Sequence, residues 1–401
     1  MLWKDYTGPA EKDIGQRQLS ACGIAGYMNF DGKRESGEKI KKMIVTLKDR
    51  ENGLGAGFAA YGIFPNYAEQ YCLQFLFDDE FVRDQTIEYL KEKVDIVKSE
   101  KVPTQLPDSR IPSPLKPPIV WRVFIDPLKV IPQEEHDDYV VSIVMHVNAE
   151  IEGAFCISSG KNMAVFKGNG WSEEIADFYK IQDYKAYLWT SHSRFPTNSP
   201  GWWGGAHPFS ILDWSVVHNG EITSYGTNKR YLETFGYKCT LLTDTEVLAY
   251  LFDLLVRRHK IPVPIATIAF NPPLYDKIEL MDKKYQLALK NIRITYRSAM
   301  VNGPFSIIVG RSLPKPAIIS LTDRKKLRPQ VVALSEDENT LYIASEEAAI
   351  KSAVLDPRFN ADYEKVWMPS AGKPVIGVMG EGIVKYGTEE PFEGYTLSIM
   401  E

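Results

Sequence analysis

Short apolar segments that follow one another in runs are the feature that most constrains how this chain can fold. The segments after residue 138 that we expect to be strands are 139–147, 163–167, 186–192, 214–217, 306–309, 317–321, 330–334, 341–344 and 374–378. The helices that we expect between them are 172–179, 244–258, 280–291 and 346–355. Because strands come in runs and do not alternate strictly with helices, the pattern favours an α+β fold over a doubly wound sheet. Such a fold has antiparallel sheets covered by helices.

The N-terminal part of the chain adds three strands and two helices to this pattern. Residues 23–29 form an apolar run that fits a buried strand. Residues 52–64 alternate glycine with apolar residues, as strands packed closely against other backbone do. The sequence YCLQFLF at 71–77 predicts a third strand, and the helices are expected at 38–49 and 79–97.

A proline-rich stretch separates this part from the rest of the chain. Eight prolines lie in residues 103–132, which excludes a regular helix there. The stretch predicts an extended connection with a strand at 119–125, and an insertion of this length is usually a surface feature or a partner contact. We therefore expect a leader at 1–21 and one domain at 22–401, with the proline-rich insertion at about 100–135 of that domain.

The charge and hydropathy of the chain exclude several classes of function. The formal net charge is −5 and no basic field is present, so neither nucleic acid nor an anionic membrane is an expected partner. No apolar run approaches the roughly 20 residues that cross a bilayer. Residues 1–21 also lack the apolar core of a secretory signal. We expect a cytoplasmic protein.

The four cysteines are far apart, and none belongs to a C-x-x-C pair. This spacing argues against a zinc site and against a disulfide framework, so no metal site is expected. Apolar or strand-like surroundings predict that Cys72, Cys156 and Cys239 are small buried core residues. Cys22 differs from them, because it stands between a polar leader and a predicted strand.

The stretch SHSRFPTNSPGWWGGAHPF at 191–209 ends a strand at a cationic residue, Arg194. The loop after it is rich in proline, glycine and tryptophan, so it cannot be helical, and we expect it to expose large aromatic side chains. A planar guanidinium at a strand end suits the bidentate capture of a carboxylate. Taken alone, the segment is better explained by a surface ion pair beside a long loop.

The stretch VVHNGEI at 216–222 leads an apolar strand into His-Asn-Gly. The side-chain amide of Asn219 and the backbone N–H of Gly220, presented together, are the donors that an oxyanion hole needs. Taken alone, the segment is better explained by an ordinary Asn-Gly hairpin turn.

The stretch LLTDTEVLAYLFDLLVRR at 241–258 predicts a capped helix. Thr243 and Glu246 form a T-x-x-E capping box ahead of an apolar run. Asp244 would then lie in the first turn, where the helix dipole favours a negative charge. A well-capped core helix accounts for these residues, and in addition Asp244 could receive a ligand ammonium.

Four motifs in this order resemble those of the class II glutamine amidotransferases, whose glutaminase domain uses an N-terminal nucleophile. The motifs are C-G-I-A-G from Cys22, H-S-R-F-x-T-N, H-N-G-E-I and T-D-T-E-V. The amidotransferase domain of glutamate synthase is the most similar, through HSRFPTNSPGW, AHPF and HNGEITSYGTNKR. Weaker similarity, as in MPSAGKPVIGV, extends the resemblance from Cys22 to about Gly382. It is weakest across the proline-rich insertion and residues 260–300.

The resemblance implies a four-layer αββα sandwich of two mostly antiparallel sheets, the Ntn-hydrolase fold. It also implies that the Cys22 thiolate attacks the side-chain amide of glutamine, that ammonia leaves, and that water resolves the thioester to glutamate. The base would be the freed α-amino group of the same residue. An α-amino pKa of about 7.7–8.0 lies near the thiol pKa of about 8.5, so the amine can take the thiol proton near neutral pH.

Further residues of the four motifs match the groups with which the family binds its substrate. Asn219 and Gly220 match the oxyanion hole. Arg194 matches the group that binds the α-carboxylate of glutamine, and Asp244 matches the group that binds its α-ammonium. These residues are carried over because their motifs match, and composition or spacing alone does not assign their roles.

Two residues inside the motifs, Thr197 and His218, are expected to shape the pocket. The loop 195–205 resembles the family's mobile loop that closes over glutamine. Closure of such a loop excludes water and helps to commit the ammonia to transfer.

Glutaminases of this family are fused or bound to a synthase that consumes the ammonia. No segment of this chain resembles a flavin barrel, an iron–sulfur cysteine cluster or a nucleotide-binding P-loop. The resemblance therefore implies a stand-alone glutaminase subunit, with glutamine as substrate and the synthase subunit of a split glutamate synthase as partner. No cofactor is expected on this chain, and FMN and iron–sulfur clusters are expected only on partner subunits. The proline-rich insertion is a candidate docking surface.

The leader at 1–21 is best explained as a propeptide, because the chemistry requires Cys22 at a true N-terminus. Two alternatives stay open. A non-catalytic structural or regulatory subunit would keep both the fold and the leader. The same enzyme could also serve the synthesis of asparagine, glucosamine-phosphate, phosphoribosylamine or N-methylglutamate, and the glutamate-synthase-like motifs weigh against the first three.

Overall fold

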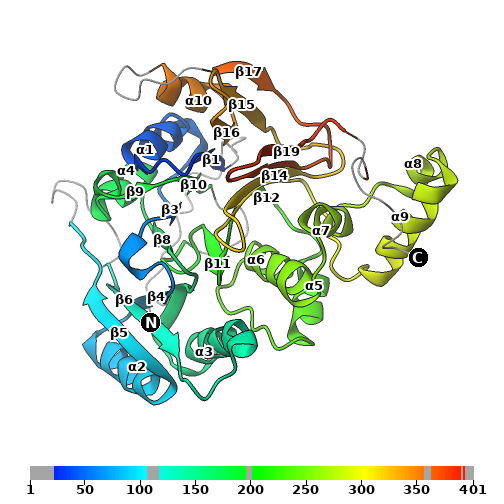
Figure 1. The fold of residues 1–401 in the computed structure, drawn as a ribbon. Helices are drawn as coiled ribbons and strands as arrows, with labels where there is room; N and C mark the ends of the chain where they lie inside the picture. The colour runs from blue at the N-terminus through cyan, green and yellow to red at the C-terminus, as the bar shows by residue number, and fades with distance from the viewer. Residues whose placement is uncertain (1–21, 106–116, 196–200, 356–362, 390–391, 393–401) are drawn as a thin grey trace, which may run out of the picture.

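The computed structural model describes residues 22–105, 117–195, 201–355, 363–389 and 392 (Figure 1). The proposed leader at 1–21, part of the proline-rich insertion at 106–116 and Thr197 lie outside the described residues. Within these residues the strands form four sheets, and every strand pair within them is antiparallel.

The largest sheet of the described chain has β1 at its centre. Its strand order is β17 (Tyr363–Trp367), β15 (Val331–Ser335), β16 (Thr340–Ala344), β1 (Gly23–Asn29), β10 (Leu188–Ser193), β3 (Ala56–Tyr61) and β8 (Met163–Gly168). The helices that cover its outer face are α1 (Glu38–Val45), α4 (Ser172–Phe178) and α10 (Glu347–Val354). The strand β1 therefore lies between two neighbouring strands and beneath a helix layer.

The second sheet packs on the inner face of the first. Its strand order is β11 (Phe209–Ile211), β12 (Trp214–Gly220), β13 (Phe305–Arg311), β14 (Ala317–Thr322), β18 (Val375–Val378) and β19 (Gly382–Tyr386). The helices on its side of the molecule are α5 (Tyr225–Glu233), α6 (Glu246–Phe252), α7 (Val263–Phe270), α8 (Tyr275–Glu279) and α9 (Lys283–Thr295). A π-helical segment, Asp253–Arg258, continues α6.

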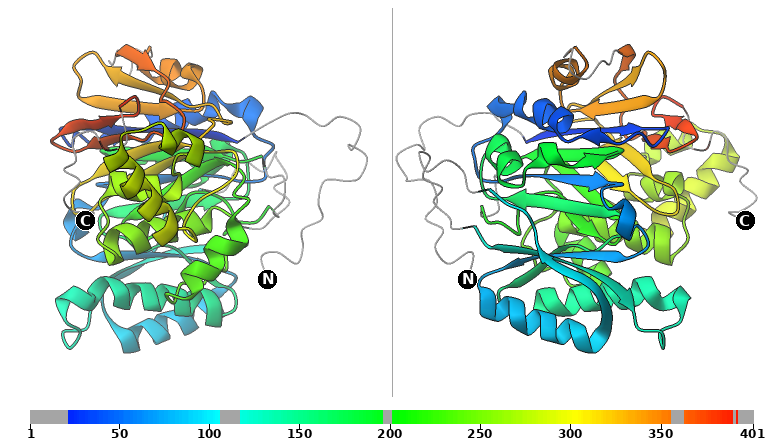
Figure 2. Two further views of the ribbon diagram at one scale, coloured as in Figure 1. Left: turned by 90° about the vertical axis from the view of Figure 1, so that its right-hand side faces the viewer. Right: turned by 60° about the vertical axis from the view of Figure 1, so that its left-hand side comes forward.

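Apolar side chains from both sheets meet in one buried core, which includes Ile24, Val217, Ile308 and Ile343. The two sheets thus lie face to face between two layers of helices (Figure 2). The four-layer αββα sandwich expected from the sequence is confirmed.

A smaller sheet packs below this sandwich and carries its own helices (Figure 1). Its order is β5 (Val94–Lys101), β6 (Ile119–Pro127), β4 (Tyr71–Phe77) and β7 (Ala154–Ser158), with α2 (Glu80–Lys93) and α3 (His136–Glu150) against it. The strand predicted in the proline-rich stretch is confirmed as β6. Because β6 lies between two other strands, this part of the stretch is an inner strand and is not a peripheral surface feature.

The remaining short elements connect these layers. They are the two-stranded sheet of β2 (Glu35–Ser36) and β9 (Lys185–Ala186) and the 3₁₀ turns Lys48–Arg50, Pro65–Tyr67, Gln133–Glu135 and Ile181–Asp183. The sequence did not predict β2, β7, β11, β17, β19, α5, α7 or α8. The helix predicted at 79–97 is wrong over its last four residues, because α2 ends at Lys93 and the strand β5 begins at Val94.

The strand predicted at 139–147 is wrong, because these residues form the helix α3. Its buried side chains are Val140, Val141, Ile143, Val144, Met145, Val147 and Asn148. A helix buried on most of its sides has an almost continuous apolar run, which periodicity cannot separate from a buried strand. The β-branched residues of this run favoured the strand, and tertiary packing overrides that preference.

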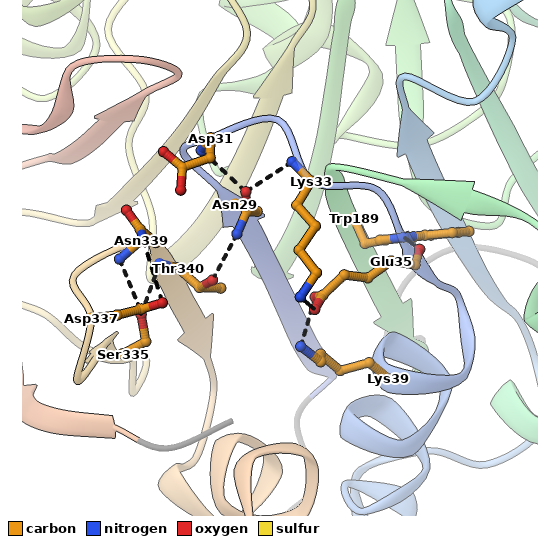
Figure 3. Close-up of polar contacts among 10 residues, drawn as sticks. All are labelled: Asn29, Asp31, Lys33, Glu35, Lys39, Trp189, Ser335, Asp337, Asn339 and Thr340. Atoms are coloured by element: carbon orange, nitrogen blue, oxygen red, sulfur yellow. Dashed lines mark hydrogen bonds and ion pairs between the residues drawn. The ribbon is translucent and has the colours of Figure 1, made fainter. Parts of the chain in front are cut away.

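The end of β1 remote from Cys22 is anchored by side chains (Figure 3). The Asn29 amide donates to Thr340 Oγ1 at 3.3 Å, and its oxygen accepts the backbone N–H groups of Asp31 and Lys33 at 3.1 and 2.9 Å. Beyond the turn, Lys39 Nζ lies 2.6 Å from Glu35 Oε2. The bond from Asn29 to Thr340 joins this end of β1 to the neighbouring strand β16.

Candidate active site

The register of β1 against β10 brings Cys22 and Arg194 to the same end of the large sheet. Gly23 pairs with Ser193 across the two antiparallel strands. Cys22, the residue before Gly23, and Arg194, the residue after Ser193, therefore lie side by side. A side chain at Gly23 would come within 2.6 Å of Ser193 Oγ, which explains why glycine follows Cys22. Sequence separation is large here, and only the sheet pairing brings the two residues together.

A pocket of about 390 Å³ opens at this end of the sandwich. It lies where β1 begins and where β10 and β12 end. The segment before α6, with Leu242 to Thr245, also lines it. Its lining residues are Cys22, Arg194, Phe195, His207, His218, Gly220, Glu221, Ile222, Tyr225, Leu242, Thr243, Asp244 and Thr245. Five of the seven site residues predicted from the sequence line this one pocket. Asn219 is fully buried and is not among the lining residues, and Thr197 lies outside the described residues.

The sulfur of Cys22 accepts the backbone N–H of Phe195 at 3.3 Å. The Cys22 carbonyl accepts Arg50 Nε at 3.2 Å, and Arg50 in turn pairs with Glu346. Burial raises the pKa of the Cys22 thiol, while the Phe195 N–H and the positive charge of Arg194 oppose the rise. A thiol with a raised pKa forms little thiolate at neutral pH, so a nucleophilic role would require a nearby base.

Asn219 and Gly220 end the strand β12 and do not form a hairpin turn, since they pair with Ser306 and Phe305 of β13. Gly220 has a φ of +141°, and a Cβ there would lie 1.9 Å from the carbonyl oxygen of Pro304, so only glycine fits. The Asn219 side chain is fully buried, and neither polar atom of its amide has a partner among the described residues. A buried amide normally has hydrogen-bond partners. An amide without them is what a binding site for a ligand oxygen would contain.

Arg194 and Asp244 place opposite charges on the lining of the pocket. Arg194 is 3% exposed, and its backbone N–H is held by Gly55 O at 2.9 Å. The Asp244 carboxylate accepts the backbone N–H of Ile222 at 2.7 Å and keeps a quarter of its side chain exposed. A zwitterion with an apolar stem fits such a pair of charges.

His192, His207 and His218 form a cluster of buried histidines at the pocket, and of these only His218 was predicted from the sequence. Thr245 Oγ1 lies 2.8 Å from His207 Nε2, 2.9 Å from His218 Nδ1 and 3.3 Å from Asp244 Oδ1. The ring of His192 stacks on that of His207, with centroids 3.9 Å apart. The AHPF motif contains His207, but a histidine beside a proline carries no signal for a role until the fold places it.

Hydrogen-bond donors and acceptors fix the protonation of this cluster. A carboxylate only accepts, so the Thr245 hydroxyl donates to Asp244, and both His207 Nε2 and His218 Nδ1 must then donate to Thr245. Burial lowers the pKa of His192, His207 and His218. All three rings are therefore neutral near pH 7, and Thr245 links two of them to the carboxylate of Asp244.

The capping box predicted for α6 is not present. Thr243 Oγ1 accepts the N–H of Thr245, and the helix begins at Glu246. The Glu246 carboxylate accepts the N–H groups of Thr240 and Leu241 at 3.1 and 2.9 Å and the Tyr250 hydroxyl at 2.9 Å. Asp244 consequently precedes the helix, and the buried Glu246 shapes the segment that carries it.

The loop after the undescribed residues 196–200 is also buried, contrary to the expectation of exposed aromatics. Trp202 and Trp203 are 2% and 3% exposed, and their rings meet Phe155 and Phe178 edge-on. Lys167 Nζ donates to the carbonyl of Gly204 at 2.9 Å, and burial lowers the pKa of Lys167 to about 7. The two tryptophans therefore belong to the hydrophobic core and do not line the pocket.

Replacing Glu246 with glutamine is expected to remove a pH-dependent cost to stability. Burial raises the pKa of Glu246 to about 7, so the folded state binds more protons than the unfolded chain between about pH 4.5 and 7. Because of this carboxyl, the free energy of unfolding of the wild type falls by about 3 kcal/mol in total as the pH rises through that window. Denaturant unfolding at pH 5 and pH 8 measures this.

Glutamine does not ionise, so this fall in the free energy of unfolding should be absent from Glu246→Gln. Between pH 5 and pH 8 the variant should therefore become more stable relative to the wild type by about 3 kcal/mol. The exposed Glu92 of α2 offers a matched control, and Glu92→Gln should track the wild type at both pH values. A constant difference between Glu246→Gln and the wild type across the window would contradict the account of this buried carboxyl.

The described residues contain neither a metal-binding cluster nor a membrane-spanning helix. No group of three or more His, Cys, Asp or Glu side chains there could hold a metal ion. In that part of the chain, no helix has the length and apolar character to cross a membrane. The predictions for three of the cysteines are confirmed, since Cys72, Cys156 and Cys239 are buried and unpaired.

The chain is similar to glutamine amidotransferases in sequence. A family model described as glutamine amidotransferases class-II matches residues 79–354, a range that includes Arg194, Asn219, Gly220 and Asp244 but not Cys22. An uncharacterized protein of Archaeoglobus fulgidus is 46% identical over 91% of this chain and 94% of its own length. A putative glutamine amidotransferase of Methanothermobacter thermautotrophicus is 28% identical over 83% of this chain and 94% of its own.

A solved structure of the Bacillus subtilis glutamine phosphoribosylpyrophosphate amidotransferase, complexed with ADP and GMP, is also similar. The TM-score is 0.46 at 16% sequence identity, and the match covers 91% of this chain and 49% of that one. This chain thus spans about half the length of that protein.

Two antiparallel sheets packed between helix layers, with a cysteine at the head of a central strand, define an Ntn-hydrolase-type fold. Since the family model matches more than half of its residues, the chain belongs to the class II glutamine amidotransferases.

Proposed function

We propose that this protein is a glutaminase subunit that hydrolyses glutamine to glutamate and ammonia through a Cys22 thioester. The observation that carries the proposal is the pocket itself, which Cys22, Arg194 and Asp244 line together. These are the groups that the chemistry needs: a nucleophile and two opposite charges for the α-carboxylate and α-ammonium of an amino acid.

Each step uses a residue of this pocket. Arg194 binds the substrate carboxylate and Asp244 its ammonium, which directs the side-chain amide toward Cys22. The α-amino group of Cys22 takes the thiol proton, and the thiolate adds to the amide carbon. The Asn219 side chain and the Gly220 N–H stabilise the oxyanion. The protonated amine then gives its proton to the departing nitrogen, ammonia leaves, and water releases glutamate and restores the thiol.

His218 and Thr197 are proposed to shape this pocket. His218 supports the proposal through Thr245, since the shared hydroxyl ties its ring to the carboxylate of Asp244. A neutral ring at this place keeps the ammonium site free of a competing positive charge. Thr197 and the loop 195–205, proposed to close over glutamine, lie partly outside the described residues.

Removal of the leader 1–21 is part of the proposal, because the base exists only when Cys22 is the first residue. The raised pKa of its thiol supports this requirement, since an unassisted thiol would be protonated at neutral pH. One cleavage, between Ala21 and Cys22, would create the nucleophile and its base together.

The ammonia is proposed to pass to a separate subunit, the synthase subunit of a split glutamate synthase. The support is the set of glutamate-synthase-like motifs, HSRFPTNSPGW, AHPF and HNGEITSYGTNKR. FMN and iron–sulfur clusters would then belong to that partner, and the protein would work in the cytoplasm. The same motifs also fit the synthesis of N-methylglutamate, and co-purification of the neighbouring subunit separates the two acceptors.

Replacing Asp244 with asparagine tests the proposed substrate site. The amide keeps the shape of the carboxylate and can still accept the Ile222 N–H, but it no longer attracts an ammonium. We expect the KM for glutamine to rise on the order of 10²-fold with a smaller change in kcat. Steady-state glutamate release measures both parameters.

The control for this experiment is Asp276→Asn, which removes the same charge from an exposed position on α8. It should leave KM within twofold of the wild type. A normal KM in Asp244→Asn would remove Asp244 from the ammonium site and would weaken the assignment of glutamine as the substrate.

A further inference from the structure

A second cavity, of about 240 Å³, lies beside α7 and α8 and shares no lining residue with the Cys22 pocket. Figure 1 places α8 at the edge of the molecule, past the end of α7. One wall comes from these helices and the turn between them, and the other from residues 371–374 and from β19 and the residues after it. The proposed glutaminase chemistry does not use this cavity.

One cationic group of the cavity, Arg324, is held in one orientation by protein acceptors. Its Nε donates to Asn271 Oδ1 at 3.2 Å, and its Nη2 donates to Asn302 Oδ1 at 3.1 Å and to the Val301 carbonyl at 3.5 Å. Asn271 is itself buried, and its amide donates to Thr322 O at 2.8 Å. Fixing a planar guanidinium before binding lowers the entropy lost when a ligand arrives.

Within the described chain, no carboxylate forms an ion pair with Arg324, and its Nη1 makes no hydrogen bond. The neighbouring carboxylate, Asp323, accepts three backbone N–H groups instead. Burial and the nearby charge of Arg293 lower the pKa of Arg324, so its charge is held at a cost. An anion in the cavity would offset that cost.

The rest of the lining has a matching character. Lys277, Lys373 and Lys385 add positive charge, against a single carboxylate, Glu389, which already accepts two backbone N–H groups. The apolar part of the wall includes Ile268, Leu274 and Met281. A cationic end beside an apolar wall suits a ligand that has an acidic head and an apolar body.

We propose that this cavity binds a small organic anion, with its acidic group on Nη1 of Arg324 and its apolar body against Ile268, Leu274 and Met281. The two N–H groups of Nη1 are the donors left over by the protein, so they receive the acid oxygen. The site is separate from the glutamine pocket, and its occupation does not depend on the chemistry at Cys22.

Calorimetric titration of the full chain with phenylacetate, hexanoate and phenyl phosphate tests the proposal. The first two probes carry a carboxylate head and the third a phosphate head, so together they also identify the preferred acid. We expect at least one of them to bind saturably at one site per chain, and the neutral phenylacetamide not to bind. Absence of saturable binding for all three anions would overturn the proposal.

Two variants locate the site. Arg324→Met should weaken the binding by about 30-fold or more, while Lys325→Met, which removes the same charge from the next residue outside the cavity, should not weaken it. Leu274→Trp fills the apolar wall from a half-buried position and should abolish binding without touching Arg324. Circular dichroism checks that each variant is folded. Wild-type affinity in both Arg324→Met and Leu274→Trp would place the probe elsewhere and overturn the proposal.

Discussion

Replacing Cys22 with alanine is expected to lower glutamine hydrolysis by about 10⁴-fold or more, because removal of a nucleophile leaves only the binding groups to act. No other cysteine of the chain can take its place. Cys72 and Cys156 are buried in the core, and burial raises the pKa of each to about 12. Cys239 is likewise buried, with its pKa raised.

The same variant should leave ammonia-dependent synthesis by the complex with the synthase intact, since the acceptor chemistry lies on the partner. Glutamate release and ammonia-dependent synthesis, measured on one preparation, separate catalysis from assembly. Cys239→Ala is the matched control and should retain glutamine hydrolysis. Loss of both activities in Cys22→Ala would indicate a structural role, and hydrolysis within tenfold of the wild type would exclude a thioester at Cys22.

Replacing Asn219 with alanine is expected to lower kcat by about 10²–10³-fold with little change in KM. The reason is that the amide would serve the oxyanion, which exists only after the thiolate has added. In the structure this amide is fully buried beside Gly220, and neither of its polar atoms has a partner among the described residues. It therefore has no structural hydrogen bond there to lose, and the effect should fall on the reaction.

A second buried asparagine provides the control for this prediction. Asn29, at the other end of β1, is bonded to Thr340 and to two backbone N–H groups. Asn29→Ala should lower the denaturation midpoint and leave kcat nearly unchanged. If Asn219→Ala instead behaved like Asn29→Ala, with lost stability and normal kcat, the oxyanion assignment would be wrong.

Much of the sandwich could be predicted from the sequence, because its strands are short, apolar and bounded by turns. The runs at 23–29 and 71–77 became β1 and β4 with the expected bounds. The strand prediction for 139–147 failed for a physical reason. These residues form α3, which is buried on most of its sides, and such burial leaves too little periodicity to separate a helix from a strand.

Site residues that belong to a sequence motif could be predicted. Site residues that meet only in the folded structure were missed. Arg194 and Asp244 were named from the sequence and now line one pocket with Cys22. The bridge that Thr245 makes between His207 and His218 depends on three segments meeting in space, and no local pattern encodes that meeting. The local capping pattern at Thr243 was misleading, since the buried Glu246 bonds to the backbone before the helix instead.

The glycines show a similar division between local and long-range causes. Gly220 could be read as part of a turn, but its requirement comes from Pro304 on a distant segment, whose carbonyl oxygen would lie 1.9 Å from a Cβ. The second cavity is a further case, because Asn271, Val301 and Asn302, which fix Arg324 by hydrogen bonds, lie more than 20 residues before it in the sequence. Such sites become visible once the chain is folded.

The rate at which Cys22 is alkylated by a glutamine-shaped chloromethyl ketone, followed by intact mass, tests the central claim most directly. Two preparations are compared: the chain that begins at Cys22 and the chain that keeps residues 1–21. We predict one adduct per chain, at Cys22, blocked by glutamine, and formed at least about 10²-fold faster when the α-amino group is free. Equal rates in the two preparations, or an adduct elsewhere, would contradict the claim that Cys22 is a nucleophile activated by its own amine.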